Sequence, residues 1–501
     1  MTGMHYTWIQ KRQNPELGIL KKLDRIMGNC HFFEEFKACT ANFLPFNISD
    51  HSPSLLILHE VTSKKPRPFR FMNFLAEKPE FLDVVKAQWN APIEGFAMFV
   101  LDKRLKLMKR RMRNLNKNNG NVFVKVKKLK AELERVQKDL DKDPYFSVMR
   151  EEEMVYSNAY KNALLDEERL LRQKSKIEWL KEGDLNNAFF HNSLKGRLNK
   201  SRIESIIDDE GQSFTGADVA AKFVEYFQNI FGIEGDTYPV DDPIQFFSKK
   251  ISEEDALDMI KPVTSEEIKL ALFDIEDNKA PGPDGFTSKF FKASWGIVGG
   301  DVCRAVKEFF NSGKMLGELN TTIISLVPKS KTPNKTSDYR PIACCGVVYK
   351  CISKVITNRI KKVLNELIDP NQGAFIEGRQ ISDNILLIQE LMNGYTWKNK
   401  IRRCAFKVDI QKVYDTVSWD FLKLALDYFG FHSKMVNWIM VCLSTASFSI
   451  NVNGDSFGFF KAKRGLRQGD HVSPYLFTII MEVFNLMDKR QISGSLVFSP
   501  H

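Results

Sequence analysis

The sequence has no long apolar run and no cysteine pattern typical of a disulfide-stapled or zinc-bound fold. Its 501 residues contain no apolar stretch long enough to span a bilayer, which takes about 18 residues, and the first ten residues lack the apolar core of a secretion signal. None of the eight cysteines forms a Cys-x-x-Cys pair, so we interpret them as reduced thiols, mostly in the core. These absences predict a protein that has no membrane partner, is not secreted, and resides in the nucleus, the cytoplasm or both.

Acidic residues are absent from one long stretch of the chain. The 73 Lys and Arg exceed the 62 Asp and Glu, which gives a formal net charge of +11 and favours an anionic partner. Residues 103–130 contain twelve Lys or Arg and no acid. Over 101–140, apolar residues keep the 4-3 spacing of a helical heptad seam, and only Gly120 argues for a break. The stretch is therefore either a solvated helix face or a helical arm that binds nucleic-acid phosphates. The second interpretation assigns this contact to Lys109, Arg110, Arg111 and Arg113.

The length and the 43% apolar content are enough for two or three separate cores. We divide the chain into residues 1–60, a basic and mostly helical linker region over 61–260, and a third region over 261–501. Near the end of the first region, the apolar run in ISDHSPSLLILHE predicts a buried strand. Residues 201–215 predict a β-hairpin that turns at Glu210-Gly211.

A single carboxylate marks the stretch CAFKVDIQKVYDTVSW (404–419). Asp409 lies in the apolar, β-prone run Phe406–Ile410, and the aromatic Tyr414 follows five residues later. A carboxylate on a core strand is costly unless it is paired or binds a cation. Taken alone, Asp409 reads more readily as a helix cap or an ion-pair member. The segments that flank it favour a cation site instead.

Five flanking segments give this stretch its context. They are NKAPGPDG (278–285), LVPK (326–329), SDYRPI (337–342), QGAFIEGR (372–379) and GLRQGDHVSP (465–474). With the Asp409 stretch, and in this order, they resemble the reverse transcriptase of non-LTR (LINE-type) retrotransposons. The resemblance covers about 278–490. It implies an α+β fold with the fingers and a partial palm of a right-hand polymerase over 261–501. It also implies target-primed reverse transcription, with an RNA template, a DNA target and primer, and dNTP as partners.

The resemblance assigns a role to individual residues. Nucleotidyl transfer uses two divalent cations about 4 Å apart. Asp409 would bridge two Mg²⁺ ions, the carbonyl of Ile410 would be a further ligand, and Tyr414 would exclude a ribose 2′-hydroxyl. The remaining nucleotide-binding residues that the resemblance implies are Lys329 and Arg340, which would hold the triphosphate, and Gln468 and Gly469, which would pack near the base pair. The chain departs from the family at Val413, where Ala is usual, and at His471-Val472, where Pro-Leu is usual.

The first region carries a second resemblance. YTW (6–8), KLDR (23–26) and SDHS (49–52) resemble the last part of an apurinic-type endonuclease, which folds as an endonuclease/exonuclease/phosphatase-type α/β sandwich. Residues 1–60 would then be the C-terminal remnant of such a domain. The resemblance implies that His51 meets the scissile phosphate, Asp24 orients its imidazole and Asp50 lies at the metal. A hydrogen-bonded Asp–His pair is an effective way to fix the tautomer of the imidazole.

Three interpretations of the whole chain follow. The first is a LINE-type polyprotein fragment that ends before the family's Asp-Asp motif and thumb, because no Asp-Asp pair follows Asp409. The second is a non-catalytic remnant that binds nucleic acid. The third is a maturase of the group II intron type, which shares the palm, but the nuclease-like head argues against it.

We predict that a polypeptide of residues 1–501 does not extend a primer by itself. Asp409 alone cannot hold two divalent cations against their mutual repulsion. The test is primer extension on an RNA template with Mg²⁺ or Mn²⁺, beside an Asp409→Ala control. Extension above the level of that control would contradict the prediction.

Overall fold

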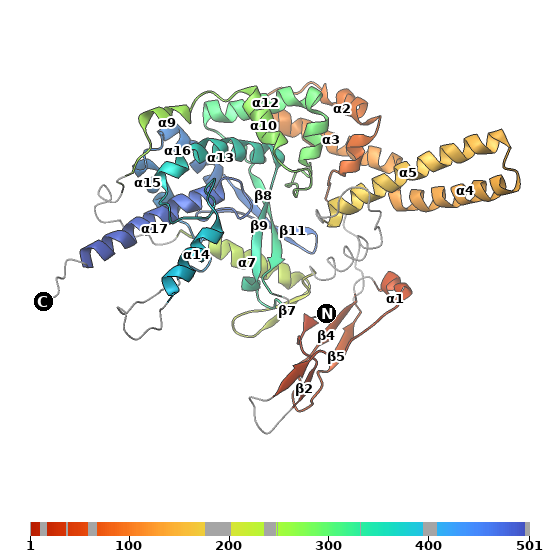
Figure 1. Ribbon diagram of the computed structural model, residues 1–501, viewed down its shortest axis with the longest axis horizontal. Coiled ribbons are helices and arrows are strands. Elements are labelled where there is room, and N and C mark those ends of the chain that lie inside the picture. Colours follow the sequence, from red (N-terminus) through yellow and green to blue (C-terminus); the bar gives the residue numbers. More distant parts are fainter. Residues whose placement is uncertain are drawn as a thin grey trace.

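The computed structural model describes residues 2–10, 18–36, 39–58, 68–175, 202–234, 247, 249–330, 332–393 and 408–495. This part of the chain contains separate runs of helices and of strands (Figure 1), which agrees with the α+β class expected from the sequence. Among the described helices, none is long and apolar enough to cross a membrane.

A four-stranded sheet of order β11-β10-β8-β9 lies at the centre of the molecule. Its strands are β8 (Thr321–Pro328), β9 (Tyr339–Cys345), β10 (Ser447–Val452) and β11 (Asp455–Lys461). β8 and β9 form an antiparallel hairpin, whereas β10 runs parallel to β8 although about 120 residues separate them. β8 is rich in β-branched residues, and side chains of this kind pack well on a pleated surface.

Helices pack around this sheet and share the larger of two hydrophobic cores (Figure 1). They are α10 (Ser265–Phe273), α11 (Ser288–Ala293), α12 (Trp295–Ser312), α13 (Val347–Leu367), α15 (Trp419–Tyr428), α16 (Ser433–Ser444) and α17 (Ser473–Ser495). The short helix α9 (Glu253–Asp258) precedes them in the chain. α13 is buried on most of its surface, which makes it the central helix of this core. The short helix α14 (Ile381–Met392) has mostly exposed side chains.

A smaller core lies between the sheet and α7 (Ala217–Phe231). Phe223, Phe227 and Phe231 recur at helical spacing, and the ring of Phe231 stacks on that of Phe448 at 5.7 Å. The predicted hairpin precedes α7 as β6 (Ser205–Ile207) and β7 (Ser213–Thr215), which pair antiparallel, so that prediction is confirmed.

The basic stretch is helical as predicted, but it forms two helices instead of one continuous seam. α3 (Ala97–Asn118) ends before Gly120, whose φ of +74° lies in the left-handed region, and α4 (Val122–Lys142) follows. The apolar side of α3 packs into the larger core together with α2 (Phe81–Trp89) and the 3₁₀ turn η2 (Asn73–Glu77). This packing crosses the boundary that the sequence predicts at residue 260.

A helical arm projects from the body of the molecule (Figure 1). It consists of α4 and the antiparallel α5 (Ser147–Ser175), whose C-terminal part returns to η2. There the side chain of Gln173 accepts a hydrogen bond from the Asn73 amide at 2.9 Å, and Lys78 pairs with Asp166.

The N-terminal region forms small sheets of its own. Its elements are β1 (Thr2–Gly3), β2 (Trp8–Gln10), β3 (Ile19–Lys21), α1 (Cys30–Glu35), β4 (Thr40–Phe43) and β5 (Ser54–Ile57). β5 is the strand predicted from the apolar run, but the prediction that it is buried is wrong. It is an edge strand paired only with β4 among the described strands, and the side chains of Leu55 and Leu56 are 48% and 39% exposed.

The strand predicted around Asp409 is not found where the structure describes this stretch. Phe406 lies outside the described residues, while residues 408–410 have no strand conformation and are exposed, Val408 at 69%. A strand requires a partner that completes its ladder of hydrogen bonds. None of the described strands pairs with this segment.

Candidate functional site

The loop at residues 465–470 is anchored in the core by two charged side chains. Arg467 and Asp470 are 4% and 0% exposed, and their Nη2 and Oδ2 atoms lie 3.4 Å apart. The hydroxyl of Tyr349 donates to Asp470 Oδ2 at 2.6 Å, and the hydroxyl of Ser353 donates to Oδ1. Burial raises the pKa of Tyr349 well above its ordinary value, so its hydroxyl stays protonated as a donor. Both ends of the Gln468-Gly469 step are therefore fixed.

Gln468 connects this loop to two other parts of the chain. Its carbonyl oxygen accepts a hydrogen bond from the Ala343 amide of β9 at 2.8 Å. Its Nε2 donates to Oδ1 of Asp415, also at 2.8 Å. Gly469 has a φ of +103°, which few other residues tolerate. The two RQGD residues expected in the nucleotide pocket thus lie between β9 and the turn that follows Asp409.

That turn is held tightly against the same loop. The amides of Leu466 and Gly465 donate to the carbonyls of Tyr414 and Val417, both at 2.7 Å. Gly465 has a φ of +90°, and a Cβ at this position would lie 2.6 Å from the carbonyl oxygen of Asp415. Only glycine permits this approach, so the sequence GLRQG suits a loop that packs directly on backbone.

Asp415 is a functional candidate that the sequence analysis missed. It is 6% exposed, and burial raises its pKa, whereas the hydrogen bond from Gln468 and the charges of Lys329 and Lys412 act in the opposite direction. Its sequence signal was weak, because a carboxylate six residues after Asp409 does not reveal its partner. The side-chain amide of Gln468 needs a hydrogen-bond acceptor, but the sequence does not show that this acceptor lies 53 residues earlier in the chain.

Tyr414 presents its ring against the last described helix. The ring stacks on Phe477 of α17 with centroids 4.4 Å apart and an interplanar angle of 27°. Burial raises the pKa of its hydroxyl. Helix α17 therefore supports the aromatic residue that the resemblance places under the sugar.

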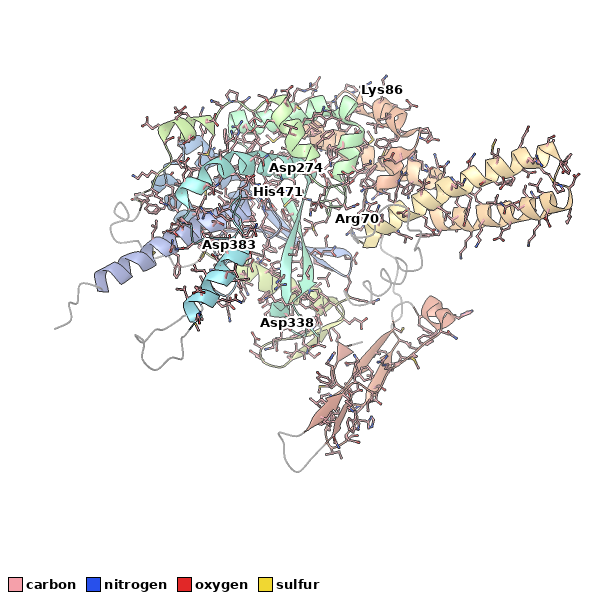
Figure 2. All side chains as sticks on the ribbon, in the orientation of Figure 1. Arg70, Lys86, Asp274, Asp338, Asp383 and His471 are labelled. Carbon is pink, nitrogen blue, oxygen red and sulfur yellow. The ribbon has the colours of Figure 1, made fainter. Side chains whose placement is uncertain are left out.

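Lys329 and Arg340 lie at the loop end of the β8–β9 hairpin, and both are exposed. Arg340 pairs with Val327 in the strand register, and the Lys329 amide donates to the Asp338 carbonyl at 2.8 Å. Lys329 is two positions from Val327, so the register places it on the same face as Arg340. Asp338, labelled in Figure 2, accepts from two amides of the connecting loop and shapes this end of the hairpin.

His471 occupies the position where the family usually has proline. Burial lowers the pKa of its imidazole, with the charge of Asp470 acting in the opposite direction. Its Nδ1 atom is buried and has no hydrogen-bond partner in the described part of the chain. Figure 2 labels His471 and Asp274, whose charge also acts on the imidazole. The departure from the family thus adds a polar ring beside the anchored Asp470.

Asp409 and Ile410 precede the Asp415 turn as exposed coil. Within the described ranges, no three His, Cys, Asp or Glu side chains come together in a way that could hold a metal ion. One exposed carboxylate and one carbonyl do not fit a pair of divalent cations. The described residues therefore do not form the two-metal site that the resemblance implies.

In the N-terminal region, the structure brings Asp24 and His51 together. The Nδ1 atom of His51 lies 3.0 Å from Oδ2 of Asp24, and this hydrogen bond is the main cause of a lowered pKa of Asp24. The buried hydroxyl of Thr7 accepts from the amides of Leu23 and Asp24 at 2.9 and 2.7 Å, which fixes the KLDR segment. Asp50 is exposed next to His51.

The cations at the two ends of the basic stretch are engaged within the protein. On α3, Arg104 pairs with the buried Asp301 of α12, and Lys106 pairs with Asp102 at 2.7 Å. Lys109 is half-buried, and burial lowers its pKa, with Asp284 of the GPDG segment opposing. On the outer half of α4, the ion pairs are Lys130–Glu134, Arg135 with Glu132, Asp139 and Glu152, and Lys142–Asp139.

The cations between these ends form a separate group, which we call the α3–α4 basic surface. Its exposed members have no ion pair within the described residues, and they are Arg110, Arg111, Arg113, Lys117, Lys125, Lys127 and Lys128. Arg111 donates to the side chain of Gln88 at 2.8 Å, and Arg113 lies over the ring of Phe69. Three of the four residues predicted to contact nucleic acid are therefore on this surface, and Lys109 is not.

Comparison with known proteins identifies the class of domain. The family model described as reverse transcriptase (RNA-dependent DNA polymerase) matches residues 327–495. This range contains the β8–β9 hairpin, the Asp415 turn and the anchored loop. The chain therefore contains a reverse transcriptase domain of the kind found in non-LTR retrotransposon polyproteins.

The relatives are retrotransposon proteins. The "Transposon TX1 uncharacterized 149 kDa protein" of Xenopus laevis is 24% identical over 490 residues, which are 96% of this chain and 37% of that protein. The Pol polyprotein of the type-2 retrotransposable element R2DM of Drosophila melanogaster is 25% identical over 41% of this chain and 19% of its own length. The R2 polyprotein of Nasonia vitripennis is 27% identical over 44% of this chain and 21% of its own length. The chain spans less than two fifths of the length of each.

We predict that the pKa of Asp24 rises towards its ordinary value in a His51→Ala variant, because the hydrogen bond that lowers it is lost. A carboxyl-detected NMR titration measures this, with Asp50→Ala as the matched control. An unchanged Asp24 titration in His51→Ala would show that the two side chains are not paired in solution.

We further predict that the α3–α4 basic surface governs the salt dependence of nucleic-acid binding. Each phosphate contact contributes about −0.9 to the slope of log K against log salt on duplex DNA, so Arg110, Arg113 and Lys127 changed to Gln should flatten that slope by about 2.7. The matched control changes Lys130, Arg135 and Lys142, which are paired within the protein. Equal slopes for the wild type and the first variant would contradict the prediction and support the interpretation of a solvated helix face.

Proposed function

We propose that this chain provides the fingers and part of the palm of an RNA-directed DNA polymerase of a LINE-type retrotransposon, over about residues 261–501. Its reaction would be target-primed reverse transcription, in which a DNA primer at a nicked target is extended on an RNA template with dNTP. The observation that carries the proposal is the meeting of three distant segments at one place. Lys329, Gln468 and the Asp415 turn come from the β8–β9 hairpin, the anchored loop and the stretch after Asp409.

Each segment offers a different group to a nucleotide. Arg340 is a fork that suits phosphate oxygens, and Lys329 is a point charge on the same face of the hairpin. The Lys329 ammonium donates to the Ser337 carbonyl at 2.8 Å, a bond that it can exchange for a phosphate oxygen. Gln468 and Gly469 would line the base pair, and the supported ring of Tyr414 would lie below the sugar.

The metal requirement stays a separate part of the proposal. Mg²⁺ is the cation that we propose, with Asp409 and the carbonyl of Ile410 as its ligands from this stretch. The described residues do not complete a two-metal site, so the support for nucleotide binding comes from the cations and Gln468, not from a metal.

The other two regions have proposed roles in holding nucleic acid. The α3–α4 basic surface would bind phosphates of the RNA template or the DNA target, within a linker region over 61–260. Residues 1–60 would be the remnant of an apurinic-type endonuclease domain. In that domain His51 would face a phosphate, Asp24 would orient the imidazole of His51, and Asp50 would lie at the metal. The pair of Asp24 and His51 supports this assignment.

A non-catalytic protein that binds nucleic acid is the second candidate. Two observations favour it, namely the cations on the α3–α4 basic surface, which have no ion pair within the described ranges, and the exposed coil around Asp409. This candidate binds template and primer but has no need of the β8–β9 cations or of Gln468. Nucleotide binding therefore separates the two functions.

We predict that Lys329→Ala and Arg340→Ala each weaken the binding of a fluorescent dNTP about tenfold or more. A hydrogen bond to a charged group contributes about 1.5–3 kcal/mol, and a phosphate contact is of this kind. The measurement is titration of the nucleotide into the full chain bound to an RNA–DNA template–primer whose primer end is blocked, with Mg²⁺ present.

Lys434→Ala is the matched control, because Lys434 is exposed on α16, outside the three segments. Template–primer affinity is measured for each variant and should not change. If the wild type binds template–primer but no nucleotide, or if the hairpin variants bind nucleotide as well as the control does, the polymerase proposal fails and the second candidate stands.

A further inference from the structure

We infer that Asp415 is a positioning residue of the nucleotide site, which fixes the direction in which the side-chain amide of Gln468 faces. This inference rests on the proposed function, because it assumes that Gln468 contacts the nucleotide or its base pair. Asp415 itself is not assigned a contact with substrate. It acts through Gln468.

The chemistry of the two side chains determines the direction of the amide. An amide has a donor end and an acceptor end that are nearly equal in size, so its shape alone does not choose between them. An ionised carboxylate only accepts hydrogen bonds. Asp415 Oδ1 lies 2.8 Å from Nε2 of Gln468, so the donor end must face Asp415. The acceptor Oε1 and the second N–H of the amide are then left for a ligand.

Backbone contacts hold both partners in place, so neither can follow the other if the bond is lost. The Gln468 carbonyl is held by Ala343, and its neighbours Arg467 and Asp470 are anchored in the core. The Asp415 amide donates to the Lys412 carbonyl at 2.8 Å, and the Asp415 carbonyl is in contact with the loop at Gly465. With both backbones held, the hydrogen bond between the Asp415 and Gln468 side chains determines which way the amide faces.

Burial and the neighbouring groups act on the Asp415 carboxyl group in opposite directions. Burial is the larger influence and raises its pKa. The Gln468 hydrogen bond opposes this, and so do the positive charges of Lys329 from β8 and Lys412 from the turn. Lys412 is itself held at a φ of +52°, with its ammonium 4.9 Å from the ring centre of Tyr226 on α7. Lys329, one of the two cations that would hold the triphosphate, therefore also favours the charged form of the carboxylate.

A purely structural role for Asp415 would use its side chain to close the turn. In the part of the chain that the structure describes, the turn is closed by backbone bonds from residues 415 and 416 to the Lys412 carbonyl. The carboxylate points instead to Gln468. This difference separates a positioning role from a stabilising one and can be measured.

The test is a double-mutant cycle with Asp415→Ala, Gln468→Ala and the double variant, on the full chain bound to template–primer. Each single change should weaken fluorescent dNTP binding about tenfold, the effect of losing a hydrogen bond to a charged group. If Asp415 acts through Gln468, the double variant should bind no more weakly than Gln468→Ala. Asp415→Asn keeps an acceptor but allows either amide direction, so it should lose no more than about twofold, since half or more of the population keeps the right direction.

The outcomes separate this inference from the proposed function. Additive losses in the cycle, or Asp415→Asn as weak as Asp415→Ala while thermal unfolding is unchanged, would overturn the positioning role. If Asp415→Ala does not fold, the nucleotide affinity of Asp415→Asn is compared with that of Gln468→Ala instead. If the wild type binds no nucleotide, the proposed function fails first. If the wild type binds nucleotide in a way that depends on Lys329 and the losses in the cycle are additive, the positioning role of Asp415 is rejected and the proposed function stands.

Discussion

The buried ion pair between Arg467 and Asp470 is the constraint on which the site depends. Two opposite charges taken out of water are costly unless hydrogen bonds satisfy their remaining atoms. Here Tyr349, Ser353 and Asn320 bind atoms of the pair, whereas Nε of Arg467 has no hydrogen-bond partner within the described residues. Loss of one partner would leave the other charge buried, at a cost of about 3–5 kcal/mol. Because both residues are fixed in the core, the two residues between them must turn outwards. Gln468 thereby reaches β9 on one side and the Asp415 turn on the other.

The same principle explains how one basic stretch serves both the core and the surface. α3 packs its apolar side into the larger core, and Asp301 fixes it by pairing with Arg104. Asp301 also accepts from Trp89 of α2 at 2.7 Å. Cations that have acidic partners hold the helices in place. Those near Gly120 have none within the described residues, so an external polyanion can neutralise them without breaking any internal pair. Charge pairing therefore divides structural cations from available ones along a single stretch.

Short-range sequence signals predicted the local elements well. The 201–215 hairpin, the helical basic stretch and the meeting of Asp24 with His51 all follow from turn residues, periodicity or motif spacing. The reverse transcriptase motifs likewise led to the domain that the family comparison identifies. Long-range partners were not predictable in this way. The role inferred for Asp415 depends on its hydrogen bond with Gln468, which is distant in the sequence. Likewise, the apolar seam over 101–140 does not show that α3 packs on α12 while α4 packs on α5. The expected strand at Asp409 and the burial of β5 failed because β propensity does not provide a pairing strand or a covering layer.

We propose that three segments form one nucleotide site, namely the β8–β9 hairpin (residues 327–330 and 332–343), the Asp415 turn (411–418) and the anchored loop (465–470). Photolabelling with an azido-substituted dATP examines all three at once, with the analogue bound to the full chain in the presence of an RNA–DNA template–primer and the labelled peptides mapped by mass spectrometry. The label should fall in these three segments, and unmodified dATP should displace it. Label confined to the α3–α4 basic surface or to residues 1–58, or label that dATP does not displace, would contradict it.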